Sequence, residues 1–335
     1  MRILHTIFTK GLAGTERHVT DLCNFQATTH DVAILVRSDH HLSSGLTFVS
    51  WLSPEVEVLE VPSRFPFLKM WWHVHKWNPD IIHCHHKRDA KYIGLSIRNK
   101  PKVGTLHIGY QHAYHNLDGL ICIAGWQSRA IPSQYKGLTV KIANWVPSAI
   151  GRIGSAPDEL RQRLCISETD YVIGGIGRFS VEKGFSDLAE AFIRADLPNS
   201  CLVIVGDGPE REFLARKFAS PRFVFPGAIA DPFPYYQLFD LFVLPSRFEP
   251  FGLVLLEAMH AQLPIVSTRS EGPREILPEN KVLWADPGGI DSLASAMRQT
   301  YATGMRKPVT YDLGEFRLDN QAEKIYAFYR QVCGS

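Results

Sequence analysis

The 335-residue sequence lacks the features of membrane-spanning, disulfide-rich and repeat proteins. Its six cysteines are scattered without CxxC spacing, which favours buried free thiols over disulfides or zinc ligands. No apolar run approaches the roughly 18 to 20 residues of a membrane span, and the opening stretch is too short for a signal peptide. We therefore expect a cytoplasmic protein without internal repeats or low-complexity tracts.

Charge is nearly balanced overall, at +2, but unevenly distributed. Residues 1–150 contain 16 Lys and Arg against 10 Asp and Glu, a local +6, while the remainder contains 20 against 24, or −4. Thirteen of the 14 histidines also lie in the first part, so we expect it to become more basic as pH falls. The asymmetry predicts an anionic partner such as a phosphate-bearing acceptor or a membrane surface. No recognisable binding motif points to nucleic acid.

Short apolar, β-rich runs alternate with helical segments along the chain. This alternation predicts βαβ units and parallel sheets, and hence an α/β protein with two Rossmann-like domains. A stretch rich in Pro, Ser, Gly and Ala near residues 147–157 predicts the join between them, and residues 319–332 form a predicted terminal helix. The predicted strands are Arg2–Phe8, Asp31–Arg37, Val56–Val61, Ile81–Cys84, Lys102–His107, Gly119–Ala124, Val140–Asn144, Tyr171–Ile176, Cys201–Val205, Phe223–Phe225, Leu241–Leu244, Pro264–Ser267 and Val282–Trp284.

Two glutamates eight residues apart, Glu249 and Glu257, lie in the most informative segment of the chain. An apolar run typical of a buried parallel strand, Leu241–Leu244, precedes them, and a predicted helix over Leu253–Ala261 contains the second. Ligands bind at such strand-to-helix loops, where the amides that open the helix attract anions. By themselves, however, two carboxylates near a helix start are more often a helix-dipole arrangement on a solvated face.

The context of these glutamates, Pro245-Ser-Arg-Phe-Glu-Pro-Phe-Gly252, resembles the retaining GT-B glycosyltransferases of family 4. The resemblance implies a GT-B fold, with an acceptor-side domain at residues 1–147 and a nucleotide-sugar-binding domain at 148–315 facing a central cleft. It also implies that a last helix, at 316–335, crosses back to the first domain. Glu249 would then hold the donor sugar, Glu257 would bind the ribose, and the amides of Phe251, Gly252 and Leu253 would face the donor.

A glycine-rich loop after the strand at residues 171–176 is the second part of the predicted donor site. Gly177 lets the backbone approach a pyrophosphate, with Arg178 and Lys183 as charge partners. The resemblance assigns both cations to the donor diphosphate, whereas alone they would be surface residues beside a tight turn. An NAD site is the rival reading, but it requires a third glycine where the chain has Ser180.

Three further residues match loops of the same family. Gly206, in a Gly-x-Gly-Pro-Glu loop, would lie near the nucleotide, although this sequence is also a good turn and helix start. Gly14 would face the donor phosphate and sugar, or else serve only as a turn glycine before a helix capped by Thr15. The strand ending at His107 resembles the family's Thr-x-His-Gly, so we expect this histidine to position the sugar, although a lone histidine there is usually structural.

The run His83-Cys-His-His86 suggests a metal site, because His83 and His85 share one face of a strand. No carboxylate or cysteine cluster completes the site, so we expect these residues to line the cleft instead. The family is typically metal-independent because cations and helix amides replace the metal, so we predict neither a metal nor a cofactor.

The segment Arg64–Trp77 mixes tryptophan with lysine. It is a candidate for contact with an anionic bilayer, supported by the basic residues that follow it. Alternatively, Leu68, Trp71, Trp72 and His75 form the buried stripe of an ordinary helix, since they have i, i+3, i+4, i+7 spacing.

The sequence therefore predicts a retaining, metal-independent transferase that moves a hexosyl group from a nucleotide sugar to a hydroxyl of a glycan or lipid-linked acceptor. A UDP-sugar is our first choice of donor, ahead of GDP and ADP donors, and a cell-surface polysaccharide or lipopolysaccharide is the suggested acceptor. A GT-B sugar-nucleotide epimerase and a non-catalytic nucleotide-sugar-binding protein remain alternatives.

Overall fold

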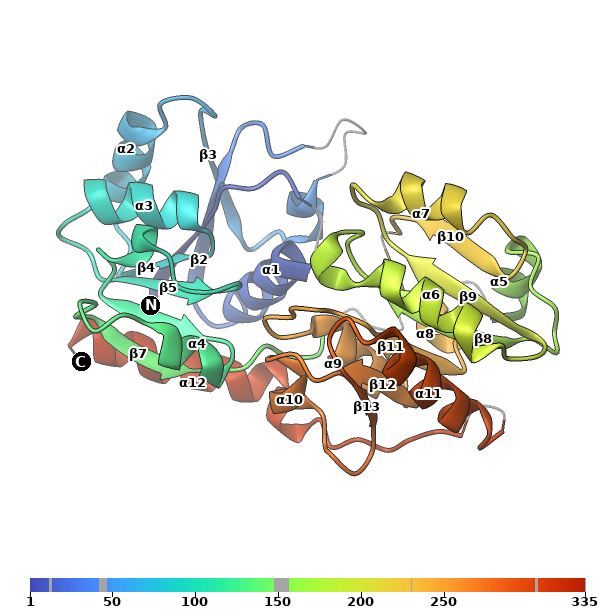
Figure 1. The fold of residues 1–335 in the computed structure, drawn as a ribbon. Helices are drawn as coiled ribbons and strands as arrows, with labels where there is room; N and C mark the ends of the chain where they lie inside the picture. Colours follow the sequence, from blue (N-terminus) through green and yellow to red (C-terminus); the bar gives the residue numbers. More distant parts are fainter. Residues whose placement is uncertain (12–13, 42–46, 148–156, 230, 305–306, 335) are drawn as a thin grey trace. The chain divides into compact units, whose positions relative to one another are not determined.

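The computed structural model describes residues 1–11, 14–41, 47–147, 157–229, 231–304 and 307–334. The chain divides into two compact units, residues 1–148 with 315–335 and residues 149–314. Each unit contains one parallel sheet covered by helices (Figure 1). The central strands are apolar runs buried on both faces, as is typical of parallel sheets, whereas the edge strands are partly exposed. The predicted α/β architecture with two Rossmann-like halves is confirmed.

The first unit contains a seven-stranded sheet in the order β3-β2-β1-β4-β5-β6-β7. The order reverses between β1 and β4, where His5 pairs in register with His83. Loops at the carboxyl ends of two such strands diverge to opposite sides, which opens a binding crevice in α/β folds. The strands are β1 (Arg2–Ile7), β2 (Asp31–Arg37), β3 (Glu57–Val61), β4 (Ile81–Cys84), β5 (Lys102–Leu106), β6 (Gly119–Cys122) and β7 (Leu138–Lys141).

Helices cover both faces of this sheet. Apolar residues of α2 and α3 pack with Leu4, Leu35 and Ile82 on one face, whereas α12 packs with Ile3 and Ile81 on the other. The terminal helix α12 thus completes the core of the first unit, as Figure 1 shows, which confirms the predicted return of the chain. The helices of this unit are α1 (Gly14–Gln26), η1 (Phe48–Trp51), α2 (Phe67–Trp77), α3 (Lys87–Ser96), η2 (His112–Tyr114), α4 (Gly125–Ala130), η4 (Gly314–Phe316) and α12 (Leu318–Cys333).

The second unit contains a six-stranded sheet in the order β10-β9-β8-β11-β12-β13, which reverses between β8 and β11. Apolar residues of α6, α7 and α11 cover one of its faces. The strands are β8 (Tyr171–Ile176), β9 (Ser200–Val205), β10 (Phe223–Gly227), β11 (Leu241–Leu244), β12 (Ile265–Thr268) and β13 (Leu283–Ala285). The helices are α5 (Pro157–Arg163), η3 (Val181–Lys183), α6 (Phe185–Ala195), α7 (Arg211–Lys217), α8 (Phe233–Leu238), α9 (Leu253–His260), α10 (Pro273–Ile276) and α11 (Ile290–Tyr301).

Helix α2 buries a different stripe from the one named as the alternative to membrane contact. Its buried residues are Met70, His73, Val74 and Trp77, so the predicted stripe of Leu68, Trp71, Trp72 and His75 is wrong. Both sets have helical spacing, so periodicity could not choose between them. Two contacts with β3 hold the observed stripe against the sheet. His73 Nε2 lies 3.1 Å from the Glu60 carbonyl oxygen, and Trp77 Nε1 donates to Glu57.

Two other sequence expectations concern thiols and membranes. Four of the six cysteines are buried, as predicted, but Cys165 is exposed and Cys333 is half-buried. Within the described ranges, no helix combines the length and apolarity needed to cross a bilayer.

Candidate functional site

An ion pair between Lys183 and Glu249 lies at the carboxyl edge of the second sheet. The two residues come from the loops that follow β8 and β11, the neighbouring strands at which the strand order reverses. Lys183 Nζ lies 2.6 Å from Glu249 Oε2, and Ser246 Oγ donates to the same oxygen at 3.3 Å. Glu249 is only 5% exposed, so the unpaired carboxylate would be strongly destabilising there. The pair therefore fixes a cation at the place where α/β sheets bind ligands.

The loops after β8 and β11 are held together by backbone and side-chain bonds. Gly184 has φ +68°, and a Cβ there would collide with the Pro245 carbonyl oxygen, so the close approach requires glycine. The Arg247 backbone N–H donates to the Glu182 carbonyl at 2.8 Å. The Arg247 guanidinium also donates two bonds of 2.8 Å to Asp187 in α6, which raise the pKa of Arg247. These bonds fix Lys183 relative to Glu249.

Helix α9 begins directly after this pair. Gly252, at φ +107°, precedes its first residue, Leu253. The first amides of an α-helix have no intrahelical acceptor, and its dipole favours anions at this end. One turn further on, Glu257 is buried and its Oε2 accepts a 2.6 Å hydrogen bond from the Tyr236 hydroxyl in α8. The structure thus gives this predicted ribose ligand a protein partner as well.

Arg178 and Gly206 lie on neighbouring loops of the same edge. Arg178 is exposed, in contrast to Lys183, and follows Gly177 directly. A Cβ at Gly206, which has φ +135°, would collide with the Gly177 carbonyl oxygen. The Phe179 N–H donates to the Asp207 carbonyl at 2.9 Å. The glycine-rich loops after β8 and β9 are therefore packed backbone to backbone, and the structure brings these predicted residues together with Lys183 and Glu249 within one unit.

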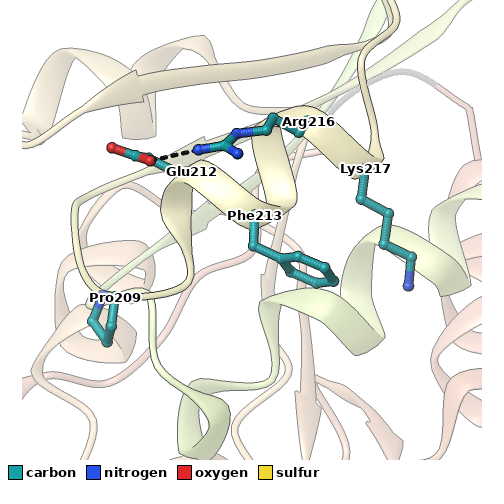
Figure 2. Close-up of a pocket in the computed structure, with 5 residues that line it drawn as sticks. All are labelled: Pro209, Glu212, Phe213, Arg216 and Lys217. Atoms are coloured by element: carbon teal, nitrogen blue, oxygen red, sulfur yellow. Dashed lines mark hydrogen bonds and ion pairs between the residues drawn. The ribbon is translucent and has the colours of Figure 1, made fainter.

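A surface pocket in this unit lies along α7. Figure 2 shows the side chains of Glu212, Phe213, Arg216 and Lys217 projecting from the helix, with Pro209 at its beginning. Its lining includes no predicted site residue. Two of its charges pair with each other, since Arg216 Nη2 donates to Glu212 Oε2 at 2.8 Å. The pocket has no convergent polar groups, so we do not assign the site to it.

The predicted residues of the first unit, Gly14 and His107, lie at helix and strand ends. Gly14 is exposed and is the first residue of α1, so Thr15 lies inside the helix rather than capping it. Residues 12 and 13 of the predicted loop lie outside the described residues. His107 directly follows β5 and is half-buried. Its surroundings hold its pKa well below the usual range, mainly through desolvation.

Four other histidines form a buried cluster with His107. His83 and His85, which we expected to line a cleft, are 0% and 1% exposed, so that expectation is wrong. His5 and His18 complete the cluster, and burial lowers their pKa values to about 4 and about 3. These rings stay neutral in mild acid, which limits the predicted gain of positive charge as pH falls.

One ring nitrogen from each of His5, His83 and His85 lies within 4.8 Å of the other two, a geometry open to a metal ion. Protein groups already occupy all six nitrogens. His83 contacts the Tyr329 and Thr105 hydroxyls at 2.7 Å each. His5 and His85 contact each other at 2.9 Å, and their remaining nitrogens contact Gln26 and His107. A metal ion would have to displace these contacts.

Comparison with known proteins identifies the family. Residues 12–136 match the family Glycosyltransferase Family 4, and residues 170–303 match Glycosyl transferases group 1. The chain belongs to glycosyltransferase family 4. It is 28% identical over 322 residues to the lipopolysaccharide core biosynthesis glycosyltransferase LpsD of Rhizobium meliloti, an alignment that covers 89% of this chain and 88% of LpsD.

Solved glycosyltransferases share the fold of this family 4 enzyme. The structure of a glycosyltransferase from Rickettsia africae has a TM-score of 0.80 at 17% identity, covering 99% of this chain and 98% of that one. Anabaena Alr3699/HepE in complex with UDP-glucose has a TM-score of 0.77 at 19% identity, covering 99% and 100%. The GT-B fold and the retaining class of transferase expected from the sequence are confirmed.

Several residues that shape this candidate site were missed in the sequence. Ser246 and Arg247 lie inside the segment that carried the prediction, but nothing in their spacing reveals their contacts with Glu249 and Asp187. Tyr236, the partner of Glu257, lies 21 residues upstream in another helix. A signal existed only for the histidines, because His5 lies within one predicted strand and His85 directly follows another, and the two strands become neighbours.

We predict that the enzyme loses stability in mild acid because neutral buried histidines must be protonated. An unfolded histidine has a pKa near 6.5. His5 therefore contributes its full stabilisation above that pH, and about 3 kcal/mol is lost as pH falls to its folded value of about 4. Urea unfolding between pH 7.5 and 4 should show this decline.

The variant His18→Phe should flatten the pH dependence, because the ring that stacks on Trp145 is kept and one titration is removed. The exposed His260 of the second unit provides a matched control, since His260→Phe should leave the slope unchanged. An unaltered slope in His18→Phe would contradict this account.

Proposed function

We propose that the enzyme transfers a hexosyl group from a nucleoside diphosphate sugar, with UDP as the preferred nucleotide, to a hydroxyl of a glycan or lipid-linked acceptor. One observation carries the donor assignment: Lys183 is fixed by the buried Glu249 beside the start of α9, at the reversal of strand order. A cation, helix amides and close backbone turns together suit a diphosphate.

The relatives support the finer parts of this proposal. HepE, which shares the fold, was solved in complex with UDP-glucose, and this favours a uridine nucleotide. LpsD acts in lipopolysaccharide core biosynthesis, and this favours a cell-surface polysaccharide or lipopolysaccharide acceptor. The positive charge of the first 150 residues suits a phosphate-bearing acceptor of this kind.

The chemical step is a displacement on one face of the sugar, with retention at the anomeric carbon. The bond from that carbon to the diphosphate oxygen breaks, the acceptor oxygen bonds to the carbon, and the departing phosphate takes the acceptor proton. Negative charge grows on the leaving oxygen, so Lys183 and the exposed Arg178 stabilise the transition state. Glu257 accepts from the ribose hydroxyls, Glu249 and His107 hold the donor sugar, and Gly14 lets the backbone face it. No metal or cofactor has a part in this step.

We predict that nucleoside diphosphates stabilise the enzyme against heat through this site. A ligand at about 100 times its Kd adds roughly 2.7 kcal/mol of stability. UDP should therefore raise the melting temperature more than GDP, ADP, CMP or NAD at equal concentration. Lys183→Met should weaken UDP binding about 10- to 100-fold, because a charge-assisted hydrogen bond contributes roughly 1.5 to 3 kcal/mol.

Lys217→Met is the matched control for that experiment. Lys217 lies in the same unit, lines the pocket along α7 and pairs with Glu190, so its loss should leave the UDP shift intact. Equal loss of the shift in both variants, or a shift with NAD alone, would contradict the donor site.

A turnover assay separates a transferase from an epimerase or a binding protein. We predict that UDP is released from a UDP-hexose at an appreciable rate only when an acceptor is supplied, with the product bond keeping the donor's anomeric configuration. Release should persist in EDTA, because Lys183 and Arg178 supply the positive charge. Free sugar formed at the same rate without acceptor would reject the transferase proposal, and loss of activity in EDTA would reject metal independence.

We also propose that α2 brings the enzyme to an anionic bilayer. Five apolar residues at or before this helix are unusually exposed: Phe65 and Leu68 at 86%, Trp71 at 50%, Trp72 at 48% and Phe67 at 41%. The segment 64–77 contains three Lys and Arg and no acidic residue. Lys76 Nζ lies 4.7 Å from the centre of the Trp72 ring. Exposed tryptophans among lysines suit the boundary between lipid headgroups and acyl chains.

The neighbouring helix α3 extends this basic surface. Its Lys87, Arg88 and Lys91 are exposed, and it contacts α2 through the edge-to-face rings of Tyr92 and Phe67. A basic residue near an anionic leaflet contributes about 1 kcal/mol to binding. The charge of this surface therefore favours anionic lipid over an uncharged bilayer.

We predict that the enzyme sediments with vesicles that contain phosphatidylglycerol and not with pure phosphatidylcholine vesicles. The double variant Leu68→Ser with Trp71→Ser should lose most of this binding without a change in melting temperature, because both side chains are exposed. Phe213→Ser, at an equally exposed position of the second unit, is the control. Undiminished binding by the double variant would contradict the proposal.

A further inference from the structure

A row of hydrogen-bonded side chains connects the interior of the first unit to His107. Gln26 Oε1 lies 2.7 Å from His5 Nε2, and His5 Nδ1 lies 2.9 Å from His85 Nε2. The row ends with His85 Nδ1 and His107 Nε2, 3.4 Å apart, its longest contact. Gln26 ends α1, His5 lies in β1, and His85 and His107 directly follow β4 and β5. Four separate elements therefore contribute to one continuous row.

Burial changes sharply along this row. Gln26 and His5 are 0% exposed and His85 is 1% exposed, whereas His107 is half-buried. Desolvation keeps the three rings neutral, because it lowers their pKa values. Each neutral imidazole has one nitrogen that donates through its N–H and one that accepts through its lone pair. The choice of donor nitrogen in one ring therefore fixes the choice of donor nitrogen in the next.

The Gln26 amide sets this direction. Its Oε1 can only accept, so His5 Nε2 carries the proton and His5 Nδ1 accepts from His85 Nε2–H. His85 Nδ1 then accepts from His107 Nε2–H, which leaves the lone pair of His107 on Nδ1.

We propose that Gln26, His5 and His85 are positioning residues that fix the tautomer of His107, so that its Nδ1 accepts a hydrogen bond from a sugar hydroxyl of the donor. The sugar contact rests on the proposed transfer function, whereas the tautomer rests on the side-chain row alone. A hydroxyl-binding acceptor with a fixed lone pair discriminates sugars by the position of their hydroxyls, because an unmatched buried acceptor loses its hydrogen bond.

The 15N chemical shifts of the His107 ring test the tautomer directly, with His107→Gln used to assign its signals. In the wild-type enzyme we expect a protonated Nε2 and an unprotonated Nδ1. Gln26→Met removes the acceptor with little change in side-chain volume and should give a mixture of tautomers. Gln26→Glu keeps an accepting oxygen and should keep the wild-type tautomer. Thr105→Val removes the hydroxyl that contacts His83 Nε2, outside the row, so it is the control and should change nothing at His107.

Kinetics then test the consequence for transfer. Gln26→Met should lower kcat/KM roughly tenfold, the scale of one lost hydrogen bond, and Gln26→Glu should restore most of it. His85→Phe interrupts the row at a second point and should reproduce the effect of Gln26→Met on both the shifts and the rate, which guards against a folding defect in one variant.

Two results would overturn the proposal that the row fixes the tautomer of His107. One is a wild-type His107 protonated on Nδ1, and the other is a tautomer that is unchanged in both Gln26→Met and His85→Phe. Failure of the transfer function is separate, because an enzyme without turnover would still show the predicted ring shifts.

Discussion

A carboxylate removed from water needs a cation beside it, and the second unit of this enzyme is organised around that need. Glu249 is buried behind the end of β11, and Lys183 reaches it from the loop after β8 at 2.6 Å. The close approach of Gly184 to Pro245 and the Arg247–Asp187 hydrogen bonds fix the loops after β8 and β11 relative to each other. The amides at the start of α9 follow within a few residues, so a diphosphate would meet a prepared set of donors instead of having to assemble one.

The first unit does the opposite, because it holds a cluster of uncharged histidines, of which His5, His18, His83 and His85 are buried and His107 is half-buried. The ring nitrogens of His5, His83 and His85 contact one another, His107, or hydroxyl and amide groups, as His83 does with Tyr329 of the terminal helix. His18 Nδ1 is buried without a hydrogen-bond partner among the described residues. The His83–Tyr329 contact links the returning helix α12 to the end of β4, so the helix contributes to the polar interior as well as to the apolar core. The positive charge of the unit then comes from surface lysines and arginines, several of them on α2 and α3, and the histidines add little in mild acid.

The sequence predicted the strands closely, because each parallel strand is a short run of apolar residues between turns. All 13 predicted strands exist, and several, such as Asp31–Arg37, match to the residue. The family motifs predicted that Lys183, Glu249 and Gly206 lie together, and the structure places all three at one edge of the second sheet. Their binding to the donor stays a prediction. Local patterns failed where tertiary contacts decide. The buried stripe of α2 is chosen by β3, and the Tyr236–Glu257 and Gln26–His5 contacts join elements far apart in the sequence.

Hydrogen–deuterium exchange of the whole enzyme with and without UDP tests the central claim, that donor phosphates bind where the strand order of the second unit reverses. We expect slower exchange at the backbone amides of residues 177–184 and 251–256, and no change along α7 at 211–217. Lys183→Met should diminish the protection at both loops. Protection confined to α7, or protection at the two loops that is as strong in Lys183→Met as in the wild type, would contradict the account.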